Sequence, residues 1–160
     1  MKKIFSFFLF SVLISNGFSQ GINNLWLMGY QSWAGPPLFG GVNMDFSGGV
    51  LNTSYQSRPM NFNCTNSNIC DAAGNLLFCC NGLYIANATF DTMQNGSGIN
   101  PGIYTTNRDS FGLAIPQANL IIPFADDSSK YYLFHETCDD YGHTYCTLHL
   151  YYSVIDTYRI

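Results

Sequence analysis

Residues 76–86, LLFCCNGLYIA, decide the fold class of this chain. Two apolar runs, Leu76–Cys80 and Leu83–Ala86, flank the dipeptide Asn81-Gly82. Asn-Gly between two such runs is the strongest short-range signal for a β-hairpin, because both residues tolerate the positive φ angles of a type I′ turn. The stretch therefore predicts two antiparallel strands joined by a type I′ turn.

Further strand-like runs lie on both sides of this hairpin. Each is rich in aromatic or β-branched residues and is bounded by turn-forming residues; they are Leu25–Tyr30, Val42–Phe46, Leu120–Phe124, Lys130–His135 and Leu148–Ile155. Residues 126–129 predict a second hairpin, and the longer segment 136–147 predicts the loop of a third. No window of a dozen residues beyond residue 20 has the apolar period of a helix. The predicted fold class is therefore all-β, and the strand spacing fits a sandwich, a barrel or propeller blades.

One segment, 87–118, is predicted to be a long loop. Its residues 95–102 read NGSGINPG, which is a sequence of turn formers throughout. Loops of this length are uncommon inside a compact domain and are usually functional or run over the surface.

The composition predicts a packed globular domain. Of the 160 residues, 47% are hydrophobic, 16% are aromatic and 10% are charged, which excludes most disordered and coiled-coil classes. The formal charge of -4 comes from 6 Lys and Arg residues against 10 Asp and Glu residues. Because proteins bind nucleic acids largely through basic groups that displace counterions, this composition argues against a nucleic-acid partner.

Residues 1–19 have the pattern of a signal peptide. Two lysines precede the apolar run 4–14, and small or polar residues follow it up to Ser19. The run is shorter than the roughly 20 residues that a membrane-spanning helix needs. We therefore expect cleavage after Ser19 and a mature chain, residues 20–160, that has no membrane span and is secreted or lies on the outer cell surface.

Four of the six cysteines are candidates for disulfides in this oxidising compartment. Cys64 and Cys70 bracket a short polar segment, as do Cys138 and Cys146, and each pair is expected to close a small loop. The other two, Cys79 and Cys80, are adjacent in a predicted strand, so their side chains point to opposite faces, and they are expected to be free or to act as small core residues.

A zinc site is the alternative for the second cysteine pair. Cys138, His143, Cys146 and His149 offer the four Cys and His ligands of a tetrahedral shell. Their spacing does not match familiar zinc fingers, and an exported protein oxidises such a pair more readily than it binds metal. The sequence therefore favours the disulfide, and no metal or other cofactor is predicted.

Several separate strings of this chain occur in an order found in a known group of proteins. They are RPMNF at 58–62, NICD at 68–71, GNLLF at 74–78, MQNG at 93–96, GINPG at 98–102, YYLFH at 131–135 and LYYSVID at 150–156. Over about residues 24–156 the chain thus resembles the N-terminal region of large secreted Bacteroidota proteins, which commonly end in a sorting domain for type IX secretion. The matched strings consist of core aromatics and turn residues, so the resemblance assigns no catalytic residue.

This resemblance implies that residues 20–160 are the first blades of an incomplete β-propeller. Propellers close with four to eight blades, and about 140 residues supply about three. We therefore expect a fragment whose partners include further blades of its own chain, and which self-associates or dissolves poorly when isolated. The alternative is a small β-sandwich stabilised by two disulfides.

The sequence favours a non-catalytic function. It contains no Gly-x-Ser-x-Gly elbow and no P-loop, and the adjacent carboxylates of Asp139 and Asp140 do not suit the two sides of a glycosidic bond. The hypothesis is a binding or adhesion scaffold for an extracellular glycan or protein, in which Trp26 and Trp33 are candidates to stack on sugar rings. The alternative is the N-terminal part of an extracellular propeller hydrolase that acts on polysaccharide.

Overall fold

The computed structural model describes residues 21–31, 39–107, 111–141 and 144–159. Its strands are β1 (Leu25–Met28), β2 (Val42–Asp45), β3 (Asn52–Tyr55), β4 (Ser67–Cys70), β5 (Leu76–Cys80), β6 (Tyr84–Asn87), β7 (Thr92–Ser97), β8 (Asn119–Pro123), β9 (Lys130–Glu136), β10 (Asp139–Tyr141), β11 (Thr144–Cys146) and β12 (Leu150–Asp156). The helical elements are short, namely η1 (Gly21–Asn23), α2 (Ile103–Asn107) and η3 (Thr157–Arg159). The all-β prediction is confirmed. The predicted signal peptide, residues 1–19, and Trp33 lie outside the described residues.

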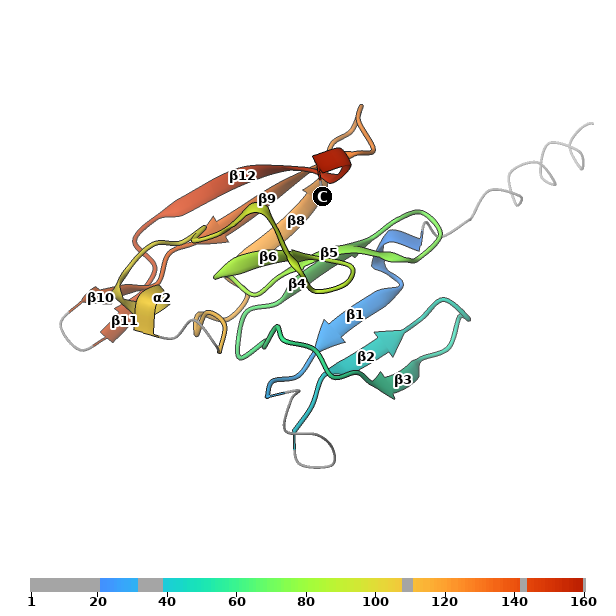
Figure 1. Ribbon diagram of the computed structural model, residues 1–160, viewed down its shortest axis with the longest axis horizontal. Coiled ribbons are helices and arrows are strands. Elements are labelled where there is room, and N and C mark those ends of the chain that lie inside the picture. Colours follow the sequence, from blue (N-terminus) through green and yellow to red (C-terminus); the bar gives the residue numbers. More distant parts are fainter. Residues whose placement is uncertain (1–20, 32–38, 108–110, 142–143, 160) are drawn as a thin grey trace, which may run out of the picture.

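The strands form three antiparallel sheets that follow one another along the chain (Figure 1). The N-terminal sheet has the order β1-β2-β3, the central sheet β4-β5-β6-β7, and the C-terminal sheet β12-β9-β8, while β10 and β11 form a separate hairpin. The structure therefore consists of consecutive meanders, with one longer connection, from β9 to β12, inside the C-terminal sheet. No helix in the described ranges is long and apolar enough to cross a membrane.

The C-terminal sheet is built on strand β9, whose residues KYYLFHE alternate between two faces. Tyr131, Leu133 and His135 are buried, and the residues between them are partly exposed. All seven β9 residues pair with β12, from Lys130 with Asp156 to Glu136 with Leu150. The predicted hairpin at residues 126–129 is confirmed, because β8 pairs antiparallel with β9.

The central sheet has a hydrophobic cluster on each of its faces. On one face, Phe78, Cys80 and Ile85 pack against Leu133 and Ile155 of the C-terminal sheet. On the other, a second cluster reaches the N-terminal sheet and consists of Leu27, Met60, Phe62, Cys79, Ala86 and Phe90. The adjacent residues Cys79 and Cys80 therefore belong to different clusters, and their prediction as core residues on opposite faces is confirmed.

The hairpin of β5 and β6 is confirmed, but the predicted type I′ turn is wrong. Cys80 pairs with Ile85, so four residues rather than two form the loop. Only Gly82 has a positive φ, 83°, whereas a type I′ turn needs two. The Asn81 side chain is buried instead, where its Oδ1 accepts hydrogen bonds from the Leu83 and Tyr84 backbone N–H groups.

The prediction of a long loop over residues 87–118 is also wrong. This segment contains strand β7, which pairs with β6, and the single-turn helix α2. β7 reads TMQNGS, which has little β propensity and only Met93 as a large apolar residue. Its strand conformation therefore comes from pairing with β6 and from burial of Met93 in the cluster beneath it.

Asn68 joins the N-terminal sheet to the central sheet through its side chain. Its Nδ2 donates a hydrogen bond of 2.7 Å to the Leu25 carbonyl, and its Oδ1 accepts one of 3.1 Å from the Leu27 N–H. The amide thus occupies the place of a peptide unit beside the edge of β1. Because the junction is partly buried, both main-chain groups depend on this amide for their hydrogen bonds.

We expect Asn68→Ala to lower the free energy of unfolding by about 1–2 kcal/mol, because two hydrogen bonds are lost. Asn68→Asp retains the acceptor for the Leu27 N–H but places a carboxylate oxygen against the Leu25 carbonyl, so it should be at least as destabilising as Asn68→Ala. Urea denaturation provides the measurement, with Asn52→Ala on the exposed strand β3 as the control. Equal stability of Asn68→Ala and Asn52→Ala would contradict the proposed junction.

Candidate functional site

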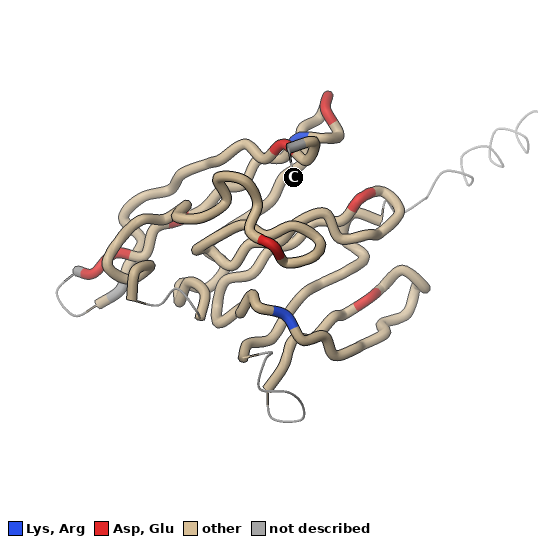
Figure 2. The backbone as a smooth tube through the Cα atoms, in the orientation of Figure 1, with Lys and Arg blue, Asp and Glu red and all other residues tan. Residues whose placement is uncertain are grey.

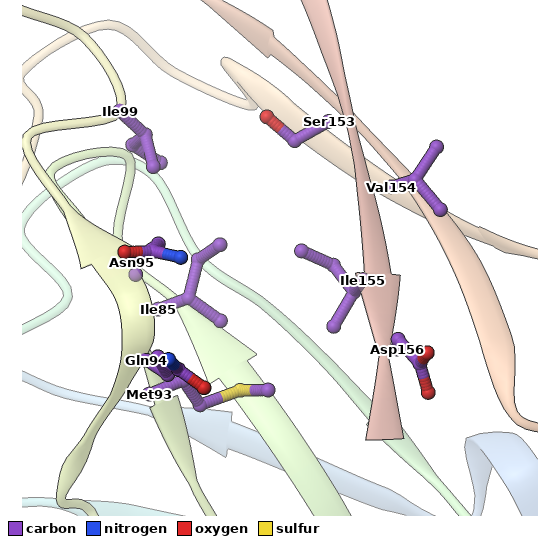
Figure 3. Close-up of a pocket in the computed structure, with 10 residues that line it drawn as sticks. Ile85, Met93, Gln94, Asn95, Ile99, Ser153, Val154, Ile155 and Asp156 are labelled. Atoms are coloured by element: carbon purple, nitrogen blue, oxygen red, sulfur yellow. The ribbon is translucent and has the colours of Figure 1, made fainter. Parts of the chain in front are cut away.

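A cleft of ≈ 450 Å³ lies between β7 of the central sheet and β12 of the C-terminal sheet (Figure 3). Its apolar lining comes from core residues, among them Ile85, Met93 and Ile155. Its polar lining includes the amides of Gln94 and Asn95, together with groups from β12. The volume lies in the range of small-molecule sites, which combine an apolar lining with a few polar groups.

A buried polar cluster stands behind this cleft. His135 is 3% exposed; its Nδ1 lies 2.7 Å from Asn100 Oδ1, and its Nε2 lies 3.1 Å from Ser153 Oγ. Asn100 Nδ2 donates a 2.7 Å hydrogen bond to the Gly82 carbonyl, which assigns Oδ1 to the histidine side. His135 Nδ1 therefore carries the proton, and Ser153 donates its hydroxyl hydrogen to Nε2. The two lone pairs of Ser153 Oγ are acceptors at the cleft.

The cluster of His135, Asn100 and Ser153 suits positioning better than nucleophilic catalysis. A serine beside a histidine is the arrangement of hydrolytic enzymes, in which a third group stabilises the imidazolium that forms. Here the third group is the neutral amide of Asn100, and burial lowers the pKa of His135 below 6.5. Ser153 also lies in the middle of a regular strand, paired with Leu133, and not on a strained turn.

The buried imidazole makes stability depend on pH. The pKa of His135 is lower in the folded chain than the value of 6.5 expected for the unfolded chain, so unfolding takes up a proton at intermediate pH. The stabilisation is complete above pH 6.5 and is lost as the pH falls through the folded-state pKa. We expect the urea midpoint to fall as the pH decreases below 6.5.

The control for this pH effect is His135→Gln, which removes the titrating group. Its urea midpoint should change less between pH 7.5 and 5 than that of the wild-type chain. A wild-type midpoint that is constant or rises over this interval would contradict the burial of a neutral His135.

The outer side of the C-terminal sheet is apolar and uncovered. We call it the aromatic face; it consists of Leu120, Ile122, Phe124, Tyr132, Phe134, Leu150, Tyr152 and Val154. Charged residues lie at the loops and strand ends around the described part of the chain (Figure 2). In this sheet they are Lys130, Glu136 and Asp156, which are terminal residues of β9 and β12.

Trp26, a predicted sugar-stacking residue, lies on the outer side of the N-terminal sheet. Its ring is 51% exposed and contacts Phe46 at a centroid distance of 5.2 Å, and its Nε1 donates to the Asn23 carbonyl. Its cross-strand neighbour is Met44. The ring is accessible, but its neighbours on this face are mainly apolar. The role of Trp26 in glycan binding stays a prediction, and Trp33 lies outside the described residues.

All six cysteines are unbonded in the structure. Cys64 is exposed and Cys70 is buried at the end of extended strand β4, so a disulfide between them requires residues 64–66 to fold back along that strand. The second pair is better placed, because Cys146 lies opposite Asp139, the neighbour of Cys138. Burial raises the pKa of the Cys138 thiol, and the nearby charges of Asp139 and Cys146 add to this effect. Both disulfides stay predictions.

We expect peptide mapping of the exported, non-reduced protein to yield a cross-linked peptide that joins Cys138 to Cys146. Cys79 and Cys80 should resist alkylation until the chain unfolds, because burial raises the pKa of each thiol to about 12. Cys138→Ser serves as the control and should leave Cys146 open to alkylation. Two free thiols at 138 and 146 with stoichiometric zinc would instead support the metal alternative.

Asp139, at the start of β10, has a structural role in the β10–β11 region. Asp139 Oδ2 accepts hydrogen bonds from Thr137 Oγ1 and from the Leu148 N–H, so this carboxylate organises the local loop. Among the described residues, no three His, Cys, Asp or Glu side chains lie close enough to hold a metal ion. His143, one of the four ligands of the zinc alternative, lies outside those residues.

The cleft and the polar cluster behind it are not evident from the sequence. Asn100 is 35 positions from His135, and Ser153 follows His135 by 18 positions, so no local spacing links the three residues. The available signals were a histidine inside an apolar strand and an asparagine beside a proline, and neither identifies its partner.

Comparison with known proteins adds no family to this description. The chain matches no protein-family model, no curated protein and no solved structure. The functional proposal therefore depends on the geometry of the molecule and on the sequence patterns described above.

Proposed function

We propose that this chain is an exported, non-catalytic binding scaffold whose cleft between β7 and β12 takes up a neutral, polyhydroxylated ligand such as an extracellular glycan. The observation that carries the proposal is the lining of the cleft. The amides of Gln94 and Asn95 and the hydroxyl of Ser153 offer donors and acceptors beside an apolar floor. Sugars present both hydroxyl groups and apolar C–H faces, and such a lining complements both.

Binding fits this cleft better than glycoside hydrolysis. A glycosidase needs two carboxyl groups about 5–10 Å apart on either side of the scissile bond. Asp156 is the one carboxylate among the described residues that line the cleft. This lining therefore suits a ligand that is bound at the cleft without being hydrolysed, which favours a binding scaffold over the alternative of a propeller hydrolase.

The arrangement of the sheets supports a blade-like architecture for this scaffold. Propeller blades are four-stranded antiparallel meanders that pack one after another, and the central sheet has four strands in chain order. Its two faces pack against the sheets that precede and follow it. The proposed location at the cell exterior rests on the signal-like residues 1–19 and on the resemblance to secreted proteins with type IX sorting domains.

A glycan array with matched variants tests the proposed ligand. Asn95 has a φ of 59°, so Asn95→Gly removes the amide while keeping the backbone conformation. We expect Asn95→Gly and Gln94→Ala each to weaken glycan retention at least about tenfold, and Trp26→Ala to leave it unchanged. Mass spectrometry of the eluted glycans should show them intact.

Three outcomes of this array would overturn the proposal or part of it. Failure of the wild-type chain to bind any glycan would refute the proposed ligand class. Loss of binding in Trp26→Ala with retention in Asn95→Gly would move the ligand to the N-terminal sheet. Release of shortened glycans would favour the hydrolase alternative.

A further inference from the structure

The aromatic face forms a continuous surface across all three strands of the C-terminal sheet. Leu120, Phe134 and Tyr152 form one cross-strand row, and Ile122, Tyr132 and Val154 form the next. Residues on the other face of the same strands pack against the central sheet. The sheet is thus apolar on both faces, which is the pattern of a sheet covered on both sides.

The rings of the aromatic face hold one another in place. Tyr132 stacks on Phe124 with a centroid distance of 4.0 Å and an interplanar angle of 14°. It also contacts Phe134 and Tyr152, each at a centroid distance of 6.0 Å. A partner that packs on rings already fixed in this way meets a smaller loss of side-chain entropy.

The exposed apolar area of this face amounts to more than half of what each partner of a stable dimer buries. Five of its residues are 40–65% exposed, namely Leu120, Ile122, Leu150, Tyr152 and Val154. At roughly 200 Å² for each large side chain, these five present about 500 Å² of apolar surface. A standard interface buries about 800 Å² on each partner, including its polar rim. The largest apolar patch on a typical monomer measures about 300–600 Å² and is often functional, and this face lies in the upper part of that range.

We propose that the aromatic face is a two-fold dimer interface, on which the same face of a second copy of this chain packs sheet against sheet. In two-fold dimers, the commonest homo-oligomers, the same surface of each subunit packs on its counterpart. Homodimer interfaces are also more apolar than those of non-obligate complexes. Lys130, Glu136 and Asp156 stand at the strand ends, where they form the polar rim of such an interface. This inference goes beyond the proposed function. The cleft floor at Ile155 lies on the opposite side of the sheet, while Val154 and Asp156 of the edge strand β12 border both the cleft and the aromatic face.

The other uncovered apolar surface provides the matched control. On the N-terminal sheet, Trp26, Met28 and Val42 share an outer face and are 51%, 42% and 38% exposed. Its strands have four residues each, so the face is smaller than that of the seven-residue strands β9 and β12. The aromatic face is therefore the one assigned to the dimer.

Sedimentation equilibrium of the chain expressed from its full coding sequence tests the dimer. We expect the wild-type chain and Trp26→Lys to sediment as dimers at micromolar concentration. Tyr152→Lys and Leu150→Lys, both at exposed positions, should raise the dimer dissociation constant at least about thirtyfold, because each places a charge in the interface. Circular dichroism establishes that each variant retains its strand content.

Each remaining outcome overturns the dimer. A wild-type chain that is monomeric at all concentrations would leave the aromatic face to a further sheet or to another protein. Dissociation caused by Trp26→Lys but not by Tyr152→Lys would place the interface on the N-terminal sheet. Dissociation by both would indicate head-to-tail association through two different faces. The glycan array uses variants at Gln94 and Asn95 on β7, which lie outside the aromatic face, so failure of the dimer and failure of the proposed function are distinguishable.

Discussion

Phe78→Ala is expected to lower the free energy of unfolding by about 3–5 kcal/mol, because it removes a large, fully buried ring. Phe78 is completely buried, and its ring meets Tyr131 edge-on at a centroid distance of 5.3 Å. It lies in the cluster that joins the central sheet to the C-terminal sheet, so its removal opens a cavity at that junction. Because small domains are stable by about 5–15 kcal/mol in total, this loss removes a large share of the stability of the fold.

Urea denaturation followed by circular dichroism measures this effect. Phe78→Leu keeps most of the apolar volume and should cost less than half as much as Phe78→Ala. Tyr158→Ala removes an aromatic ring that is 87% exposed and should change stability by at most about 0.5 kcal/mol. A loss below about 1 kcal/mol for Phe78→Ala would show that the two sheets do not pack as described.

Arg58→Ala is expected to lower the free energy of unfolding by roughly 3 kcal/mol. The Arg58 side chain is 2% exposed; Nη1 donates a 2.8 Å hydrogen bond to Asn43 Oδ1, and Nη2 donates to the Met28 and Val42 carbonyls. Its guanidinium carbon also lies 5.4 Å from the centre of the Phe62 ring. Burial lowers the pKa of Arg58, and the guanidinium is nonetheless positively charged at neutral pH.

Two conservative variants separate the contributions of Arg58. Arg58→Met retains most of the aliphatic stem and loses every donor, whereas Arg58→Lys retains the charge without the planar fork. If the hydrogen bonds to the N-terminal sheet are decisive, Arg58→Met should be nearly as unstable as Arg58→Ala, and Arg58→Lys should be intermediate. Wild-type stability of Arg58→Met in urea would show that the stem, rather than the hydrogen bonds, accounts for the effect.

The strands that could be predicted from sequence are those whose own residues form an apolar or alternating run bounded by turn residues. Strand β5 matches its predicted bounds, because its apolar run Leu76–Cys80 ends at the turn residues Asn81 and Gly82. Strand β9 extends one residue beyond its predicted end, at Glu136. Both are interior strands with neighbours on either side, where local preference and tertiary contacts agree.

The strands that sequence analysis missed obtain their conformation from their neighbours. Strand β4 reads SNIC, and two of its four residues are polar, yet pairing with β5 and the bridge from Asn68 to β1 keep it extended. Strand β3 reads NTSY and is exposed along its whole length, so pairing with β2 alone defines it. Propensity carries little information at such positions, because contacts with residues distant in sequence decide the conformation.

The cleft could not be predicted for the same reason. Its lining comes from β6, β7 and β12, and the histidine that orients Ser153 lies on β9. Sequence order does not show which of these strands approach one another across the two sheets. The expectation of an incomplete propeller predicts some uncovered apolar surface. Which residues form the aromatic face follows only from the register of β8, β9 and β12.

The chain-order arrangement of the sheets also bears on how the molecule folds. Each sheet uses one continuous segment, residues 25–55, 67–97 and 119–156, so most strand pairs form between neighbours in sequence. Closing short loops costs little entropy, so these neighbouring strand pairs can form early in folding. A chain that emerges from its N-terminus can therefore complete one sheet before the next segment appears. Each finished sheet then provides the surface on which its successor condenses.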